Sequence, residues 1–171
     1  MKILGVDPGS RATGWGLVET DGWDLTYLAH GVVKTGAKLS LPDRLRLIAD
    51  GLDAVISENR PEDMAVEQVF SSKNARSALI LGHARGVALL SASRAGLSFH
   101  EYSPMQVKSS VTGYGRAEKE QVQRAVATQL CLRELPTPLD ASDALAVALC
   151  HAAASRMSQR LAAGEVPGAP S

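Results

Sequence analysis

The first part of the chain alternates short apolar runs with turn residues, which predicts antiparallel strands. Residues 2–6 form a nearly continuous apolar run, as in a buried strand. Two further runs, at 13–19 and 23–29, flank Asp21-Gly22, a dipeptide typical of tight hairpins. Residues 31–34 extend this hairpin, so the region supplies three antiparallel strands.

Helical repeats and two more short strands follow. Apolar residues recur at helical spacing between 41 and 60, where Pro61 ends the helix. The later elements are predicted in this order: a strand at 64–66, a helix at 74–95, a strand at 97–102, a short helix from 104, a helix at about 118–130 and a last helix from about 140. The pattern predicts one α/β domain with a mixed five-stranded sheet flanked by helices, over residues 1–157. Residues 158–171 are expected to form a flexible C-terminal tail.

Composition narrows the class of protein. The chain has 171 residues, of which 45% are hydrophobic and 21% charged, as in a globular protein with a substantial core. No apolar run approaches the ~20 residues of a membrane span. The two cysteines, Cys131 and Cys150, are too few for a disulfide framework or a Cys-based zinc site. We expect a cytoplasmic protein with no membrane partner.

The formal charge is zero, with 18 basic and 18 acidic residues, but it is unevenly distributed. Residues 71–133 hold 9 basic and 3 acidic side chains, a net charge of +6, whereas both flanking segments are acidic. A basic segment of this kind indicates an anionic partner, although solvated helix faces would give the same count.

Four acidic residues occupy positions where their side chains can converge. Asp7 ends the first strand, Glu67 ends the fourth, and Asp140 and Asp143 lie on one face at the start of the last helix. If the first and fourth strands are parallel neighbours, their carboxylates emerge at the same edge of the sheet. Such oxygen ligands suit Mg²⁺, and two ions ~4 Å apart can promote phosphodiester hydrolysis.

Each acid also has an ordinary structural interpretation. Asp7 precedes Pro-Gly and suits a turn, and Glu67 suits the exposed side of a half-buried strand. Asp140 could cap the last helix, with Asp143 in its first turn. Spacing alone leaves these possibilities open.

The sequence around the acids resembles RuvC-type Holliday-junction resolvases. The matching segments, in chain order, are Ile3 to Ser10 with Thr13 to Gly16, Ala65 to Phe70 with Lys73 to Ala75 and Gly82 to Gly86, Gln106 to Lys108 with Gly113 to Lys119, and Asp140 to Ala146. They extend from the first residues to about 157. The sequence departs from part of the family at Asp140, where some members carry His.

The resemblance implies an RNase H-like fold and an endonuclease that resolves four-way DNA junctions in homologous recombination and DNA repair. It implies that Asp7, Glu67, Asp140 and Asp143 are catalytic and bind two Mg²⁺ per subunit, with Mn²⁺ as a substitute, and that Asp7 lies between the ions. It also implies a homodimer that makes symmetric nicks with 5′-phosphate ends, and a branch-migration helicase partner of the RuvA and RuvB type.

Further residues are candidates for holding DNA. Phe70 suits stacking on an unpaired base, as the family implies, although a buried core Phe is the alternative. Lys108 and Lys119 suit the scissile phosphate, with Lys119 counted among the catalytic residues, or they are simply exposed helix lysines. The weaker candidates for phosphate contacts are Lys73, Arg76 and Arg116.

The helix at 74–95 and the histidines add two more interpretations. Gly82 and Gly86 leave a small-residue face that suits either packing on the sheet or a dimer contact. His83 and His100 belong to no ligand-spaced group and are interpreted as structural or surface residues.

Other functional classes fit less well. Asp7-x-Gly9 also resembles a phosphate loop of actin-like ATPases and sugar kinases, but a second such loop and a second domain are absent from the sequence. A non-catalytic junction-binding protein would be expected to lack one or more of the acids, and all four are present. A related nuclease for another branched or RNA-containing substrate remains open.

Overall fold

The computed structural model describes residues 1–36, 38–68 and 75–164. The strands are β1 (Lys2–Asp7), β2 (Ala12–Thr20), β3 (Leu25–Lys34), β4 (Asp63–Glu67) and β5 (Ser98–Tyr102). The helices are α1 (Leu41–Asn59), α2 (Ala75–Ala95), α3 (Pro104–Thr112), α4 (Lys119–Gln129) and α5 (Leu139–Ala162). Among these residues no helix combines the length and apolar character needed to cross a membrane.

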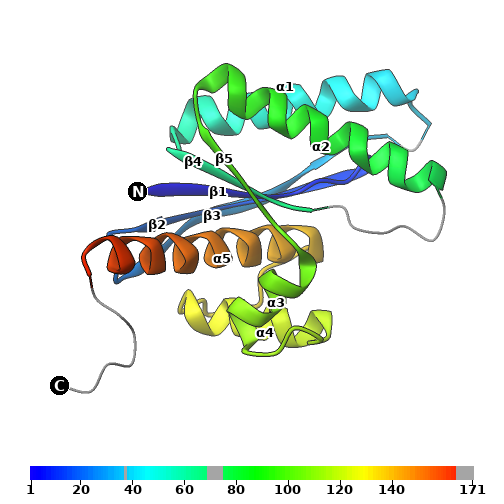
Figure 1. Cartoon of the computed structure of the whole chain (residues 1–171). Coiled ribbons are helices and arrows are strands. Elements are labelled where there is room, and N and C mark those ends of the chain that lie inside the picture. Colours follow the sequence, from blue (N-terminus) through cyan, green and yellow to red (C-terminus); the bar gives the residue numbers. More distant parts are fainter. Residues whose placement is uncertain (37, 69–74, 165–171) are drawn as a thin grey trace.

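The strands form one mixed sheet in the order β3-β2-β1-β4-β5 (Figure 1). β1, β2 and β3 pair antiparallel, while β4 lies parallel to both β1 and β5. The predicted mixed five-stranded sheet is therefore confirmed. Residues 31–34 continue β3 as a single strand that begins at Leu25.

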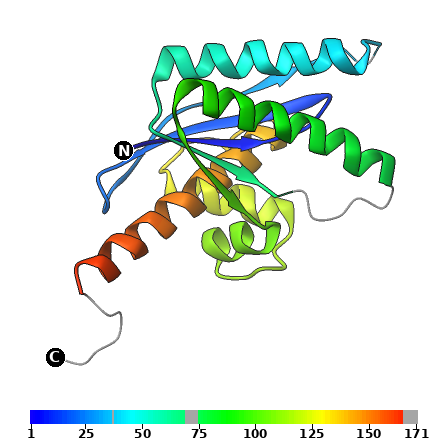
Figure 2. The same ribbon diagram turned by 45° about the horizontal axis from the view of Figure 1, so that its top comes forward.

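Helices cover both faces of the sheet (Figures 1 and 2). On one face, α1 and α2 bury apolar side chains such as Ile48 and Leu52 against Leu4 and Leu17. On the other face, α5 packs directly on the strands, and α3 and α4 pack against α5. Residues 141–152 of α5 are buried except for Asp143, because the helix lies between the sheet and other helices.

Helix α5 extends further than the sequence suggested. It continues through Ala162, so residues 158–162, which were expected to belong to the tail, are helical. Leu161, Ala162 and the Arg and Gln residues before them favour helix, which explains the extension. The division of the chain into a domain and a tail otherwise stays a prediction.

Candidate active site

The carboxyl ends of β1 and β4 bring two of the predicted acids to one edge of the sheet. β1 and β4 are parallel neighbours, with Val6 in register with Val66. Asp7 and Glu67 are the next residues and end their strands. The buried runs that precede them anchor both positions, because Val6 and Val66 are fully inaccessible to solvent. The sequence-based expectation for these two strands is confirmed.

Close backbone contact holds the start of α5 against this edge. Asp7 pairs across the sheet with Gly14, and a Cβ built on Gly14 would lie 1.9 Å from the main-chain oxygen of Asp140. A Cβ on Gly5 would lie 2.1 Å from the main-chain oxygen of Ala144. Only glycine permits such close approach, so these two positions determine how near α5 and its acids come to β1.

Electrostatic interactions link all four acids. Burial and, after it, the negative charges of Glu67, Asp143 and Asp140 together raise the pKa of Asp7 to about 7, while Lys119 opposes them. Asp7 is therefore surrounded by like charge. The structure brings the predicted carboxylates together around Asp7.

Two lysines lie beside these carboxylates. Burial and the charge of Asp143 raise the pKa of Glu67, and Lys119 and Lys108 counteract this effect. Lys119 Nζ donates a hydrogen bond to Asp143 Oδ2 at 2.8 Å. That bond raises the pKa of Lys119 and keeps its ammonium charged. Lys119 begins α4 and Lys108 lies in α3, so the two helices that pack on α5 both contribute positive charge to the site.

The capping interpretation of the α5 acids is wrong. The residue that caps α5 is Pro138, and no side chain makes a capping hydrogen bond there. Asp140 lies within the first turn, where its charge interacts favourably with the helix dipole. Asp143, one turn later, is directed to Lys119 rather than to the helix terminus.

The residues of this site suit hard divalent cations. Carboxylate oxygens are the preferred ligands of Mg²⁺ and Mn²⁺. Four carboxylates gather here with two lysines beside them, which leaves an excess of negative charge that adds to the effect of burial on the pKa of Asp7. Cations at this position would relieve the repulsion between the acids.

The remaining predicted DNA-binding residues have different positions. Arg76 is exposed near the start of α2, and Arg116 is exposed in the loop that precedes α4. Phe70 and Lys73 fall outside the described residues. Lys108 and Lys119 interact electrostatically with the acids.

A second cluster of polar side chains was not found from the sequence. Asp63, His100 and His151 place one potential ligand atom each within 4.8 Å of the others. Within the described residues this is the one group of three that meets this distance criterion. No three of the four acids therefore place their carboxylate oxygens within 4.8 Å of one another. Its members lie on β4, β5 and α5, far apart in the sequence, so no local spacing of residues could have predicted the cluster.

The sheet order and the helices on both faces are those of an RNase H-like fold, and the acids beside β1 and β4 form a candidate metal site on it. The model of the RuvC crossover junction endodeoxyribonuclease family matches residues 3–151. The chain therefore belongs to the RuvC crossover junction endodeoxyribonucleases, whose members are metal-dependent and hydrolyse DNA phosphodiester bonds.

Curated relatives and solved structures agree with this assignment. The chain is 53% identical over 152 residues to RuvC of Heliobacterium modesticaldum, covering 89% of this chain and 94% of the relative. It is 46% identical over 163 residues to RuvC of Rubrobacter xylanophilus, covering 95% and 91%. The structure of T. thermophilus RuvC in complex with a Holliday junction substrate superposes with a TM-score of 0.87 at 38% identity, covering 92% of this chain and 96% of that one.

Proposed function

We propose that this chain resolves four-way DNA junctions by paired, symmetric phosphodiester hydrolysis during homologous recombination and DNA repair. The observation that carries the proposal is the convergence of Asp7, Glu67, Asp140 and Asp143 at one sheet edge, with Lys119 bonded to Asp143. A relative 38% identical to this chain has been solved with such a junction, which supports the choice of substrate.

In this proposal the four acids hold two Mg²⁺ ions per subunit, with Mn²⁺ as a substitute. Asp7 has the other three acids around it and is the candidate for contact with both ions. When bound, the ions would supply an activated water and would stabilise the negative charge of the leaving oxygen.

The chain's own residues hold and neutralise the phosphate. Asp7 and Glu67 lie at the ends of buried strands, so their carboxylates have little freedom to move. The Asp143 carboxylate keeps the Lys119 ammonium charged and oriented. We assign Lys119 to the scissile phosphate, where its charge opposes the negative charge that develops in the transition state.

We assign the flanking DNA to the basic segment. Lys108 lies beside Glu67 and suits the phosphate next to the cut. The exposed guanidiniums of Arg76 and Arg116 suit phosphates farther along the arms, since Arg can bond two phosphate oxygens at once. The family resemblance assigns Phe70 to stacking on an unpaired base at the crossover and Lys73 to a nearby phosphate.

Cleavage of a synthetic four-way junction tests the function. With Mg²⁺ or Mn²⁺ we expect paired cuts at symmetric positions that leave ligatable 5′-phosphate ends. The affinity for the junction should fall as the salt concentration rises and should depend on the divalent ion.

Phe70→Ala should slow the cleavage of the junction, while the dependence of cleavage on the concentration of the divalent ion stays the same. Equal cutting of linear duplex and junction, or cutting that needs no divalent ion, would contradict the proposal.

Replacing Lys119 with glutamine tests whether this lysine acts in the cleavage step or only adds to the positive charge of the surface. We expect the single-turnover cleavage rate of bound junction to fall by about 10²-fold, as when one stabilising donor is lost from a reaction centre. Arg124→Gln removes a positive charge from the exposed face of the same helix and is the matched control. If both variants cut bound junction at the wild-type rate, Lys119 has no catalytic part.

Symmetric cutting requires two active sites, and one surface of α2 suits the pairing of two chains. Gly82 and Gly86 have open space where a Cβ would stand. The apolar side chains of Leu79 and Leu90 beside them are 66% and 48% exposed. These residues line a shallow groove, into which the same helix of a second copy would fit closely. We therefore propose a homodimer built on this face.

Replacing Leu79 with glutamate should convert the protein to a monomer, because a charge would be buried at the proposed interface. Sedimentation or light scattering measures the change, and paired cutting should be lost with it. Leu161→Glu is the control, since Leu161 is 57% exposed on a different helix. A dimer that persists in Leu79→Glu would place the interface elsewhere.

The family resemblance also suggests the cellular setting. We propose that the chain acts in the cytoplasm, together with a branch-migration helicase of the RuvA and RuvB type. Co-purification of such a complex on a four-way junction, compared with linear duplex, tests this part of the proposal.

A further inference from the structure

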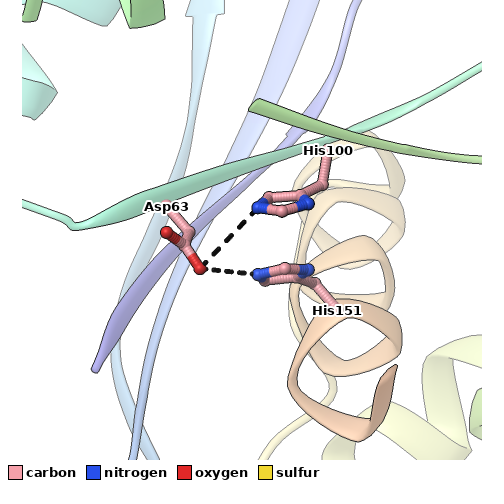
Figure 3. A group of neighbouring side chains, drawn as sticks. All are labelled: Asp63, His100 and His151. Carbon is pink, nitrogen blue, oxygen red and sulfur yellow. Dashed lines mark hydrogen bonds and ion pairs between the residues drawn. The ribbon is translucent and has the colours of Figure 1, made fainter. Parts of the chain in front are cut away.

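Two histidines face a single carboxylate oxygen on the side of the sheet that α5 covers. His151 Nε2 lies 2.8 Å from Asp63 Oδ2, and His100 Nε2 lies 3.9 Å from the same oxygen. The two imidazole rings stack, with centroids 4.2 Å apart. Figure 3 shows both rings with a nitrogen directed at the Asp63 carboxylate, one from β5 and one from α5.

These separations are close to those of a first coordination shell. Tetrahedral ligands at the Zn–N and Zn–O distances of ~2.0–2.2 Å lie about 3.3–3.6 Å from one another. Of the three ligand pairs here, His151–Asp63 is shorter than that range and His100–Asp63 longer, each by no more than about half an ångström, and the two imidazole nitrogens lie within 4.8 Å of each other. Small side-chain rotations would therefore bring the three atoms to equal distances from one ion.

A neighbouring hydroxyl supports the buried histidine. Tyr102 Oη lies 2.8 Å from His151 Nδ1, the ring nitrogen that does not face Asp63. Without an ion, Nε2–H donates to Asp63 and Nδ1 accepts the Tyr102 hydroxyl hydrogen. With a cation on Nε2, the proton resides on Nδ1 and the hydroxyl oxygen accepts it, so the histidine stays neutral. Outer partners of this kind orient the histidine ligands of many metal sites.

A serine nearby does not turn this cluster into a hydrolase triad. Ser155 Oγ lies 3.3 Å from His151 Nε2, the same nitrogen that faces Asp63. In a Ser-His-Asp triad the serine and the carboxylate occupy opposite ring nitrogens. Asp63 and Ser155 therefore both face His151 Nε2, which suits ligands around a single ion better than proton transfer from one nitrogen of the imidazole to the other.

The cluster is separate from the four-acid site. Asp63 begins β4 and Glu67 ends it, which places them about 13 Å apart along the strand. His151 follows Asp140 by eleven residues of α5, about 16 Å along the helix. The side chain of His100 is 40% exposed, that of Asp63 15% and that of His151 3%, so solvent reaches the cluster past His100.

We propose that Asp63 Oδ2, His100 Nε2 and His151 Nε2 bind a divalent cation of the Zn²⁺ class, with solvent completing its coordination. Two imidazoles and a carboxylate suit Zn²⁺ and its neighbours better than Mg²⁺, which prefers oxygen alone. The ion fastens α5, which carries two of the four acids, to β4 and β5.

Zinc binding in the presence of excess Mg²⁺ tests the proposal, because Mg²⁺ occupies oxygen sites and competes poorly for imidazole. Full-length protein stripped with a chelator should bind one Zn²⁺ per chain in calorimetry, and Zn²⁺ should raise its melting temperature. His100→Gln, chosen because His100 is the most exposed of the three ligands, should weaken Zn²⁺ binding by at least about tenfold and abolish the thermal shift. Tyr102→Phe should weaken binding about 10–100-fold.

Two controls separate this site from other zinc ligands. His83→Gln changes an exposed histidine of α2 and should bind Zn²⁺ as the wild type does. Asp7→Asn should also keep the zinc site, whether or not it cuts junctions. Equal Zn²⁺ affinity in wild type and His100→Gln, or no Zn²⁺ bound by the wild type under excess Mg²⁺, would overturn the proposal.

Discussion

Asp7→Asn should abolish junction cleavage while leaving junction binding largely intact. The amide keeps the shape of the side chain but loses the charge at the centre of the four-acid cluster. Loss of a residue that merely orients a metal ligand costs about 10–100-fold in activity, so loss of the central ligand should cost at least about 100-fold. Single-turnover cleavage and a gel-shift assay on the same junction measure the two effects separately.

The stability of this variant gives an independent check. Because Asp7 lies partly buried among three other carboxylates, removing its charge relieves repulsion in the ion-free protein. Above pH 7, where Asp7 of the wild type is mostly charged, Asp7→Asn should therefore melt at a higher temperature than the wild type without divalent ions. Asp53→Asn, on the exposed face of α1, is the matched control and should change neither property. A variant that is inactive because it is unfolded would contradict this interpretation.

Gly14→Ala should destabilise the fold and reduce cleavage together. The added methyl would stand 1.9 Å from the main-chain oxygen of Asp140, so β2 and the start of α5 must separate. Overpacking in a well-packed core costs about 1–3 kcal/mol. We expect a cost at the upper end of this range, because the added methyl would meet main-chain atoms, which cannot rotate away as a side chain can. Displacement of Asp140 by about 1 Å should also lower the cleavage rate of the folded fraction, by about 10²-fold.

A second glycine provides the contrast. Gly86→Ala adds the same methyl group where no atom of its own chain lies within 4 Å, so the free energy of unfolding of the monomer should not fall. Denaturant unfolding of both variants, at a concentration where the chain is monomeric, measures the difference. Equal stability of Gly14→Ala and Gly86→Ala would show that the contact between β2 and α5 is not close.

The sequence predicted the parts of this molecule that depend on local pattern. The apolar runs before Asp7 and Glu67 identified β1 and β4, and parallel pairing then placed both acids at one edge. The helical spacing after residue 41 likewise predicted α1. These features are encoded by neighbouring residues, and the structure confirms them.

Features that depend on contacts between distant segments could not be predicted in the same way. The close approach of Gly14 to Asp140 joins residues 126 positions apart, and glycine in a strand has several uses. The capping role considered for Asp140 fits the local pattern, but Pro138 holds that position. The cluster of Asp63, His100 and His151 needs three elements to be in place before it exists. Residues 158–162, which the sequence assigned to the tail, belong to α5, since helix formers continue to Ala162.

The proposed acids come from opposite ends of the chain, and this has a consequence for synthesis. Asp7 belongs to the first strand, while Asp140 and Asp143 belong to the last helix. A ribosome that has not yet delivered α5 holds a chain with two of the four acids, and with the α5-facing side of its sheet still uncovered. Under this proposal an interrupted or truncated product cannot cut DNA. Under the same proposal, the chain becomes able to cut DNA only after α5 has been synthesised and has packed on the sheet.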